Sequence, residues 1–308
     1  MRILLATMLS FSLLLSGTIT IKPYTDSSKY ERLTQKIVVG KMNYLQHYFD
    51  TTDVDIDILL FNKHRDFSAV TGLPKRIPGA LISNTNKIYL KTPDLTAMTA
   101  PEYEKLIAHE LIHALQNHSV SLNLFPDWFN EGLAEYFSES FGLRKKILLS
   151  KYLLRDNIHD LNALRFIVHR KYISATQEYV ESASVIEFLI ATYGKNVIAK
   201  LLKTMEKEKQ FNTALIKTLN LSEDQLNHYW QSYLKNHYGK LYLIDLQYII
   251  WLFLPFIFIF SIIMKQILNK TIINRWKYEK LEEDINQIFT APFDHNNGSK
   301  RTSSVSIK

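Results

Sequence analysis

Two histidines and a glutamate lie close together in residues 101–117, which read PEYEKLIAHELIHALQN. His109 and His113 are four residues apart, so on a helix both imidazoles leave the same face and can bind one metal ion. Glu110 would project beside that ion, where its carboxylate can accept a proton from water at the metal. The spacing predicts a catalytic zinc site, although two histidines on an amphipathic helix can also be ordinary surface residues.

A second segment, residues 126–137, supplies a third metal ligand. It reads PDWFNEGLAEYF, and Pro126 predicts the start of a helix with Glu131 and Glu135 on one face. A catalytic zinc usually has three protein ligands and one open position, so Glu131 is the natural third. Glu135 would accept the far N–H of a ligand histidine and fix its tautomer. Spacing alone also allows two solvated carboxylates, but the apolar residues of the same segment predict a largely buried helix: Trp128, Phe129, Leu133 and Phe137.

At these residues the chain resembles the gluzincin superfamily of zinc peptidases, in particular its leucyl/alanyl-aminopeptidase-like and peptidase MA-like groups. In those groups HExxH is followed downstream by Asn-Glu-Gly, and here residues 109–113 read HELIH and residues 130–132 read NEG. The resemblance implies Zn²⁺ as the cofactor, with Glu131 on the ligand position.

Residues 179–194, YVESASVIEFLIATYG, are similar to a tyrosine-led helix of the same superfamily. By that resemblance Tyr179 donates to the oxyanion that forms during hydrolysis. The alternative is that Tyr179 only packs at the start of a helix.

One departure from the family pattern concerns the substrate. Aminopeptidases of this kind have a Gly-Ala-Met-Glu-Asn strand upstream of HExxH, whose glutamate binds the free amino terminus. The corresponding residues 79–83 read GALIS and contain no carboxylate. Gly79, Ala80 and Leu81 can still pair with substrate backbone as an edge strand. We therefore expect an endopeptidase, with no reason to expect aminopeptidase specificity.

Apolar segments near both ends predict the topology. Residues 3–15 carry no charge and precede Ser-Gly-Thr, as in a secretory signal peptide, although the run extends to Ile21 and could be an uncleaved anchor. Residues 246–264 form 19 uncharged positions, close to the roughly 20 that cross a bilayer. Lys and Arg are denser after this span than before it. The positive-inside rule then places the C-terminal tail in the cytoplasm and residues 22–245 outside.

Charge and cysteine content exclude other classes of function. The net charge is +7, but residues 22–245 carry 28 Lys/Arg against 25 Asp/Glu, and residues 265–308 carry eight against five. No basic run in the middle resembles a phosphate-binding stripe, so nucleic acid is not an expected partner. The chain has no cysteine, which excludes a thiolate metal site and a cysteine nucleophile.

The elements that must position these residues indicate an α+β fold. Helical periodicity covers residues 28–49, strand patterns cover 54–61, 80–83 and 87–91, and helices follow from 101 to about 238. We predict a small N-terminal mixed sheet packed on a mainly helical zincin-type domain, plus a C-terminal transmembrane helix. Along the chain we expect a signal peptide or N-terminal anchor (1–21), an extracytoplasmic gluzincin-like peptidase domain (22–240), a transmembrane helix (246–264) and a cytoplasmic tail (265–308), disordered from 291.

Together these patterns predict a hydrolase. We expect a zinc metallopeptidase anchored in the cell membrane that cleaves extracytoplasmic proteins or peptides, with the substrate and the membrane as partners. The alternatives are a non-catalytic zinc-binding scaffold at the membrane surface and a sensor that signals through its tail. An intact Glu110 argues against the scaffold, since zinc binding alone does not need it.

Overall fold

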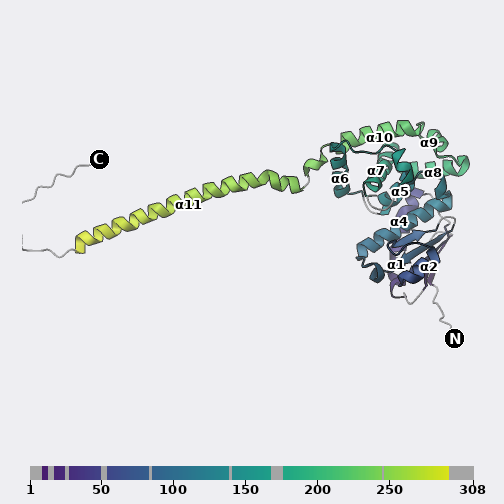
Figure 1. The fold of residues 1–308 in the computed structure, drawn as a ribbon, viewed down its shortest axis with the longest axis horizontal. Helices are drawn as coiled ribbons and strands as arrows, with labels where there is room; N and C mark the ends of the chain where they lie inside the picture. Colours follow the sequence, from purple (N-terminus) through teal and green to yellow (C-terminus); the bar gives the residue numbers. More distant parts are fainter. Residues whose placement is uncertain are drawn as a thin grey trace, which may run out of the picture. The chain divides into compact units, whose positions relative to one another are not determined.

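The computed structural model describes residues 9–12, 17–24, 28–49, 54–82, 85–138, 141–167, 176–244 and 246–290. The chain divides into two compact units, Met1–Ile244 and Asp245–Lys308 (Figure 1). The predicted disordered tail, residues 291–308, lies outside the described residues.

A mixed five-stranded sheet forms the N-terminal part of the first unit. Its order is β1-β2-β3-β5-β4, with parallel pairing of β2 with β3 and of β3 with β5. β1 and β4 form the two edges through antiparallel pairing. The strands are β1 (Leu9–Ser12), β2 (Thr18–Pro23), β3 (Ile56–Phe61), β4 (Gly79–Leu81) and β5 (Lys87–Lys91). The mixed sheet and the β4–β5 hairpin confirm the predicted pattern.

The first two strands fall in a region that the sequence assigns to a leader. Ile19 and Ile21 of β2 are buried, 2% and 0% exposed, between strands and helices of the first unit. Residues 18–21 therefore pair into the sheet in this structure. The boundary expected after residue 21 stays a prediction. A cleaved leader would have to end before Thr18 for β2 to stay intact. Whether a leader is removed stays a prediction.

Helices make up the rest of the first unit, as predicted from residue 101 onward. Glu102 accepts the Thr99 amide at 2.8 Å and caps the start of α4. A capping box of Ser222 and Gln225 begins α10, and α7 ends at Gly194 with φ +89°. The helices are α1 (Glu31–Phe49), α2 (His64–Thr71), α3 (Pro93–Thr96), α4 (Ala100–Ser119), α5 (Asp127–Ser138), α6 (Leu143–Leu154), α7 (Thr176–Tyr193), α8 (Val197–Glu208), α9 (Phe211–Leu219) and α10 (Glu223–Tyr238), with 3-10 turns η1 (Ser28–Tyr30), η2 (Leu122–Leu124), η3 (Ala163–Phe166) and η4 (Leu241–Ile244).

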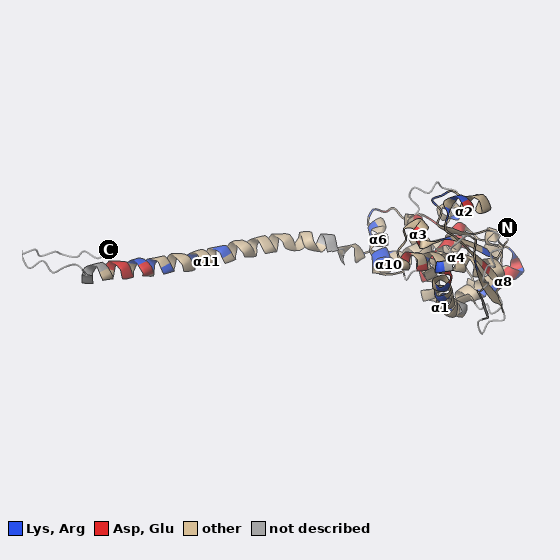
Figure 2. Cartoon of the chain, turned by 90° about the horizontal axis from the view of Figure 1, so that it is seen from below, with Lys and Arg blue, Asp and Glu red and all other residues tan. Residues whose placement is uncertain are grey.

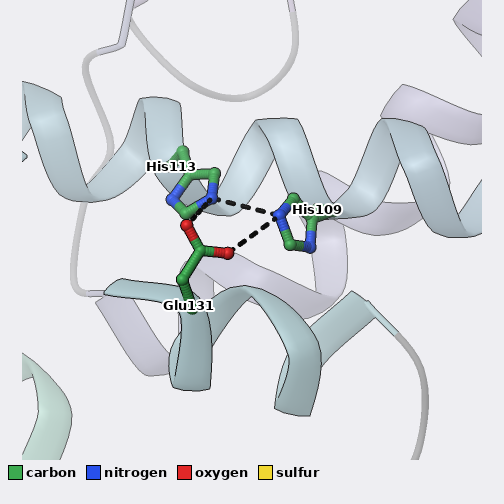
Figure 3. A group of neighbouring side chains, drawn as sticks. All are labelled: His109, His113 and Glu131. Atoms are coloured by element: carbon green, nitrogen blue, oxygen red, sulfur yellow. Dashed lines mark hydrogen bonds and ion pairs between the residues drawn. The ribbon is translucent and has the colours of Figure 1, made fainter. Parts of the chain in front are cut away.

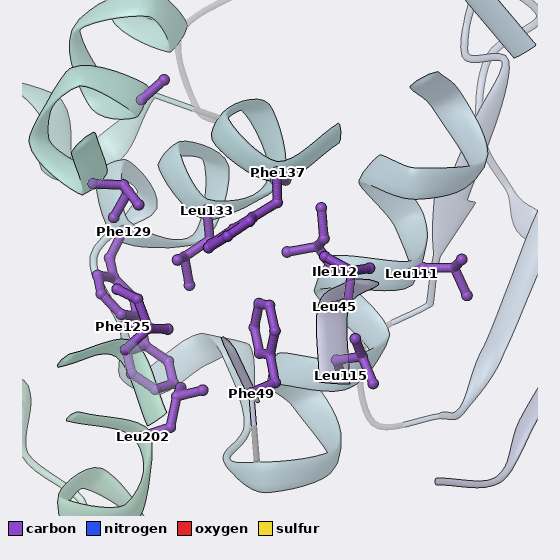
Figure 4. Close-up of a cluster of buried hydrophobic side chains, with 14 of the residues drawn as sticks. Leu45, Phe49, Leu111, Ile112, Leu115, Phe125, Phe129, Leu133, Phe137 and Leu202 are labelled. Atoms are coloured by element: carbon purple, nitrogen blue, oxygen red, sulfur yellow. The ribbon is translucent and has the colours of Figure 1, made fainter. Parts of the chain in front are cut away.

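Helix α4 lies between the sheet and the helical part (Figure 1). Leu111, Ile112 and Leu115 are fully buried on it. They belong to a cluster that includes Phe49 of α1 and Phe137 of α5 (Figure 4). Burying each such side chain contributes about 1.5–3 kcal/mol. The apolar side of α4 is thus fixed in the core, and its polar side faces a cleft.

Helix α11 (Leu246–Thr290) makes up the described part of the second unit. Its first part carries no Lys, Arg, Asp or Glu, and the charged residues follow towards its C-terminal end (Figure 2). Within the described parts of the chain it is the one helix long and apolar enough to cross a membrane. The predicted span, residues 246–264, lies within this helix, so length and composition agree with the prediction.

Candidate active site

Two helices bring the predicted metal ligands together. The Nε2 atoms of His109 and His113 on α4 are 3.2 Å apart, and Glu131 on α5 points between them (Figure 3). The Glu131 carboxylate oxygens lie 3.6 Å from Nε2 of His109 and 3.9 Å from Nε2 of His113. One ligand atom from each residue lies within 4.8 Å of the others.

The donor set fits a zinc ion. Two nitrogens bound to one tetrahedral zinc at about 2.05 Å lie about 3.3 Å apart, and the two Nε2 atoms are 3.2 Å apart. Two imidazoles and one carboxylate also leave a fourth position open, as in catalytic zinc sites. These three residues can therefore hold the metal that the sequence predicts.

Burial and mutual charge set the protonation of the three groups. Burial lowers the pKa of His113 to about 4, so its ring is neutral and offers a lone pair. Burial alone would raise the pKa of Glu131, but the close approach of the two histidines lowers it overall. Burial alone would lower the pKa of His109, but Glu131 outweighs it and raises that pKa. His113 and Glu131 are thus in the forms that bind a metal, whereas His109 would release its proton when the metal binds.

Glu110 lies beside the ligands and contacts the sheet edge. Its Oε2 accepts the backbone amide of Leu81 at 2.8 Å. Burial raises the pKa of Glu110, against the opposing charge of His109 and the Leu81 amide. A carboxylate with a raised pKa suits a general base, because its proton affinity moves towards neutral pH.

Strand β4 offers an open edge next to Glu110. Lys91 donates its amide to Pro78 at 2.9 Å, and Ile82 donates to Lys87 at 3.3 Å. Because backbone groups alternate along an antiparallel strand, those of Gly79 and Leu81 face away from β5. The Leu81 amide donates to Glu110, so the other groups that face away from β5 are the Leu81 carbonyl and the backbone groups of Gly79.

The Asn-Glu-Gly segment joins three elements around Glu131. The side-chain NH₂ of Asn130 donates to the Leu122 carbonyl at 3.0 Å. The side-chain oxygen of Asn130 accepts a hydrogen bond from the side chain of the buried Gln116 of α4. A Cβ on Gly132 would lie 2.6 Å from the Ser182 carbonyl oxygen of α7. Glycine is therefore required where α5 and α7 meet, and this close contact brings α7 next to the metal ligands.

A single cleft of about 660 Å³ contains nearly all of the predicted site. Gly79, Ala80 and Leu81 line it together with His109, Glu110, His113 and Glu131. Tyr179, in the first turn of α7, also lines it and is partly buried. The structure thus places the tyrosine and the edge strand at the same cleft as the metal ligands.

Comparison with known families agrees with this arrangement. A model of the peptidase MA superfamily matches residues 56–236, more than half of the chain. The chain belongs to the peptidase MA superfamily. The match begins with β3 and ends within α10, so it contains every residue of the cleft.

Solved structures and curated sequences were also compared with this peptidase MA chain. An M1 zinc metallopeptidase from Deinococcus radiodurans is 13% identical, with a TM-score of 0.42, over 72% of this chain and 50% of that one. A mutant form of an M1 zinc metallopeptidase from the same organism is 12% identical, with a TM-score of 0.43, over 72% and 51%. The chain spans about half the length of these structures. No curated protein sequence matches it.

Glu135 has partners other than those the sequence predicts. Its Oε1 lies 3.2 Å from Nζ of Lys105 and 2.9 Å from Nζ of Lys145. Nδ1 of His113 is buried and has no hydrogen-bond partner in the part of the peptidase MA chain that the structure describes. In this structure Glu135 pairs with a lysine from α4 and a lysine from α6 and does not bond Nδ1 of His113. That Glu135 accepts the N–H of a ligand histidine stays a prediction.

Sequence reasoning missed part of the cleft lining. Residues 122–126, which include η2, line the cleft, as do Arg165 and Phe166 of η3. Arg165 contacts Glu223, which is 58 residues away in the chain. No local spacing signals such a pair, so only the fold of this peptidase MA domain reveals it.

Proposed function

We propose that this chain is a zinc-dependent metallopeptidase that hydrolyses peptide bonds of extracytoplasmic proteins or peptides. The observation that carries the proposal is the convergence of His109, His113 and Glu131 within 4.8 Å in a cleft that also contains Glu110. Membership of the peptidase MA superfamily supports it.

Zinc, when held by His109, His113 and Glu131, supplies Lewis-acid chemistry that polarises the scissile carbonyl and acidifies water. Glu110 accepts the proton of the attacking water and delivers it to the leaving amine. The 2.8 Å bond from the Leu81 amide fixes one oxygen of Glu110. The other oxygen is then left for proton transfer.

Tyr179 is proposed to donate its hydroxyl proton to the developing oxyanion. It lines the cleft from α7, and the contact at Gly132 keeps α7 close to Glu131. Removing one such donor typically costs about 10²–10³ in kcat. The tyrosine is therefore a measurable contributor under this proposal.

The edge strand supports an endopeptidase. Gly79, Ala80 and Leu81 can bind a substrate strand through backbone groups, which recognise any sequence. Within 79–82 no side chain is acidic, so this stretch has no carboxylate to bind a free amino terminus. A peptide can then continue past the metal site in both directions.

We also propose that α11 anchors the enzyme in the cell membrane. Its uncharged first part supports a bilayer span. The excess of Lys and Arg after residue 264 supports a cytoplasmic C-terminus, with the catalytic unit outside.

Glu110→Gln tests the proposed function. The full-length chain, loaded with zinc in detergent, is incubated with an unstructured protein such as casein. Glu110→Gln should retain zinc and lose about 10²–10⁴ in rate, because an amide cannot accept the proton. Glu104→Gln is the matched control, since Glu104 lies on the same helix but pairs with Lys41 at 2.8 Å. Zinc binding without cleavage by the wild type would instead support the non-catalytic scaffold.

A further inference from the structure

Arg165 is the one Lys or Arg side chain among the described residues that line the cleft. It belongs to η3 and lies in the same cleft wall as the 61%-exposed Phe166. The other charged groups described in the cleft are Asp127 and the carboxylates Glu110 and Glu131. A guanidinium in this position can reach a bound peptide without being part of the metal site.

A buried carboxylate holds the guanidinium. Nη2 of Arg165 contacts Oε2 of Glu223, the first residue of α10. The other carboxylate oxygen of Glu223 accepts the indole N–H of Trp128 at 3.2 Å. Trp128 is fully buried on α5, and the Glu223 side chain is only 10% exposed, against 34% for that of Arg165. Arg165 is therefore the more exposed member of the pair.

The backbone around Arg165 is fixed as well. The Leu161 amide donates to the Asn227 side chain of α10 at 3.1 Å, and the Ala163 amide donates to Asp160 at 2.8 Å. Leu164 is fully buried directly before the arginine. Such anchoring holds a side chain near its working geometry before a ligand arrives.

The ion pair with Glu223 determines which kind of ligand group Arg165 can bind. The pair as a whole is neutral, so it does not offer an isolated positive charge to an acidic substrate side chain. A guanidinium has five N–H donors in a planar fork, and Glu223 receives one of them in this structure. The other donors can bind neutral acceptors, and the most common neutral acceptor on a peptide is the main-chain carbonyl.

We propose that Arg165 is a substrate-positioning residue that donates hydrogen bonds to a main-chain carbonyl of the bound peptide, with Glu223 aiming the guanidinium. The inference rests on the proposed peptidase function, because it assigns the ligand of the same cleft. β4 and Arg165 both line this cleft, so both would bind the main chain of the same peptide.

Arg165→Lys is the variant that tests the assignment. Lysine keeps the charge opposite Glu223, so the fold is retained, but it loses the planar fork. A carbonyl bound away from the scissile bond is bound equally in the ground and transition states, so KM should rise and kcat should stay nearly unchanged. Losing one charge-assisted hydrogen bond corresponds to a rise in KM of roughly tenfold to a hundredfold. Arg144→Lys is the matched control, because Arg144 is exposed on α6 and does not line the cleft.

Two probes separate this inference from the proposed function. The first is hydrolysis of an uncharged, unstructured fluorogenic peptide by the full-length zinc-loaded chain in detergent. The second is the Kd of the same peptide, labelled but uncut, for the Glu110→Gln chain with and without Arg165→Lys. Weaker binding in the Arg165→Lys chain supports the role of Arg165 even if the wild type shows no hydrolysis, which would count against the proposed function alone.

Three results would overturn the role of Arg165. One is unchanged KM and Kd in the Arg165→Lys chain. Another is a fall in melting temperature with unchanged Kd, which would make Arg165 purely structural. The third is a loss confined to peptides carrying Asp or Glu, which would mean that Arg165 selects an acidic side chain instead of a carbonyl.

Discussion

Gly132→Ala tests how the site is held together, because Gly132 is where α5 and α7 touch. An added Cβ would lie 2.6 Å from the carbonyl oxygen of Ser182, 2.9 Å from its carbonyl carbon and 3.1 Å from Cγ1 of Ile186. The first two are backbone atoms of a helix and cannot rotate away. An ordinary contact begins at 3.4 Å, so the two helices must separate by 0.8 Å along the line to the oxygen.

The expected loss of stability is the difference of two effects. Replacing a mid-helix glycine by alanine favours the helix by roughly 0.5–1 kcal/mol. Overpacking a buried contact costs about 1–3 kcal/mol, and a clash with backbone belongs near the upper end. A net destabilisation of about 1–2 kcal/mol follows, which lowers Tm by about 2–4 °C for each kcal/mol in a domain of this size.

Activity should fall further than stability suggests. α5 carries Glu131 and α7 carries Tyr179, so separating these helices moves a metal ligand away from the proposed oxyanion donor. A misplacement of about 1 Å can cost on the order of 10²-fold in rate. The assay combines thermal unfolding, zinc per chain and kcat on an unstructured peptide, all on the full-length chain.

Gly40→Ala is the matched control for Gly132→Ala. Gly40 is exposed in α1, and a Cβ there would meet nothing within 4 Å. That variant should gain about 0.5–1 kcal/mol and keep wild-type activity. If Gly132→Ala raised Tm as Gly40→Ala does and left kcat unchanged, the close packing of α5 on α7 would not be what positions the site.

Three further predictions concern the metal, the tyrosine and the membrane. The purified chain should hold about one zinc, and His113→Ala or Glu131→Ala should lose most of it by elemental analysis; equal zinc in both variants would exclude this ligand set. Tyr179→Phe should lower kcat by about 10²–10³ with zinc content unchanged, whereas full kcat would mean that the ring only packs. A reporter fused after Lys308 should be cytoplasmic, and protease added outside intact cells should reach the catalytic unit; the reverse accessibility would overturn the topology.

The metal site could be predicted from sequence because its signals are local. His109 and His113 share a helix, where spacing alone decides which face they occupy. Glu131 lies on the next long helix, and its motif matches a known pattern. The mixed sheet and the helical domain follow from equally local alternation and periodicity, so the fold class is confirmed by the structure.

Contacts between distant segments are what the local patterns do not predict. Glu135 is one helical turn after Glu131, yet Lys105 and Lys145 approach it from α4 and α6 and take its carboxylate. β2 reads as part of a leader because its apolar residues continue an apolar run, and only pairing with β3 reveals that it belongs to the sheet. The spacing of residues within one segment predicts neither contact.

Helix α7 connects the parts of the cleft that no motif predicts. Its buried Glu181 is hydrogen-bonded to Nδ1 of His159 at 2.8 Å and accepts the side-chain NH₂ of Gln177 at 2.8 Å. Because His159 lies in the segment that leads to η3, the first bond holds that segment against α7. The same helix carries Tyr179, and it rests on α5 at Gly132. A shift of α7 would therefore move the proposed oxyanion donor and the segment bearing Arg165 together, while Glu110 and β4 stay with the sheet. Gly132→Ala, which disturbs the contact between α5 and α7, should consequently change KM as well as kcat. Tyr179→Phe should change kcat alone.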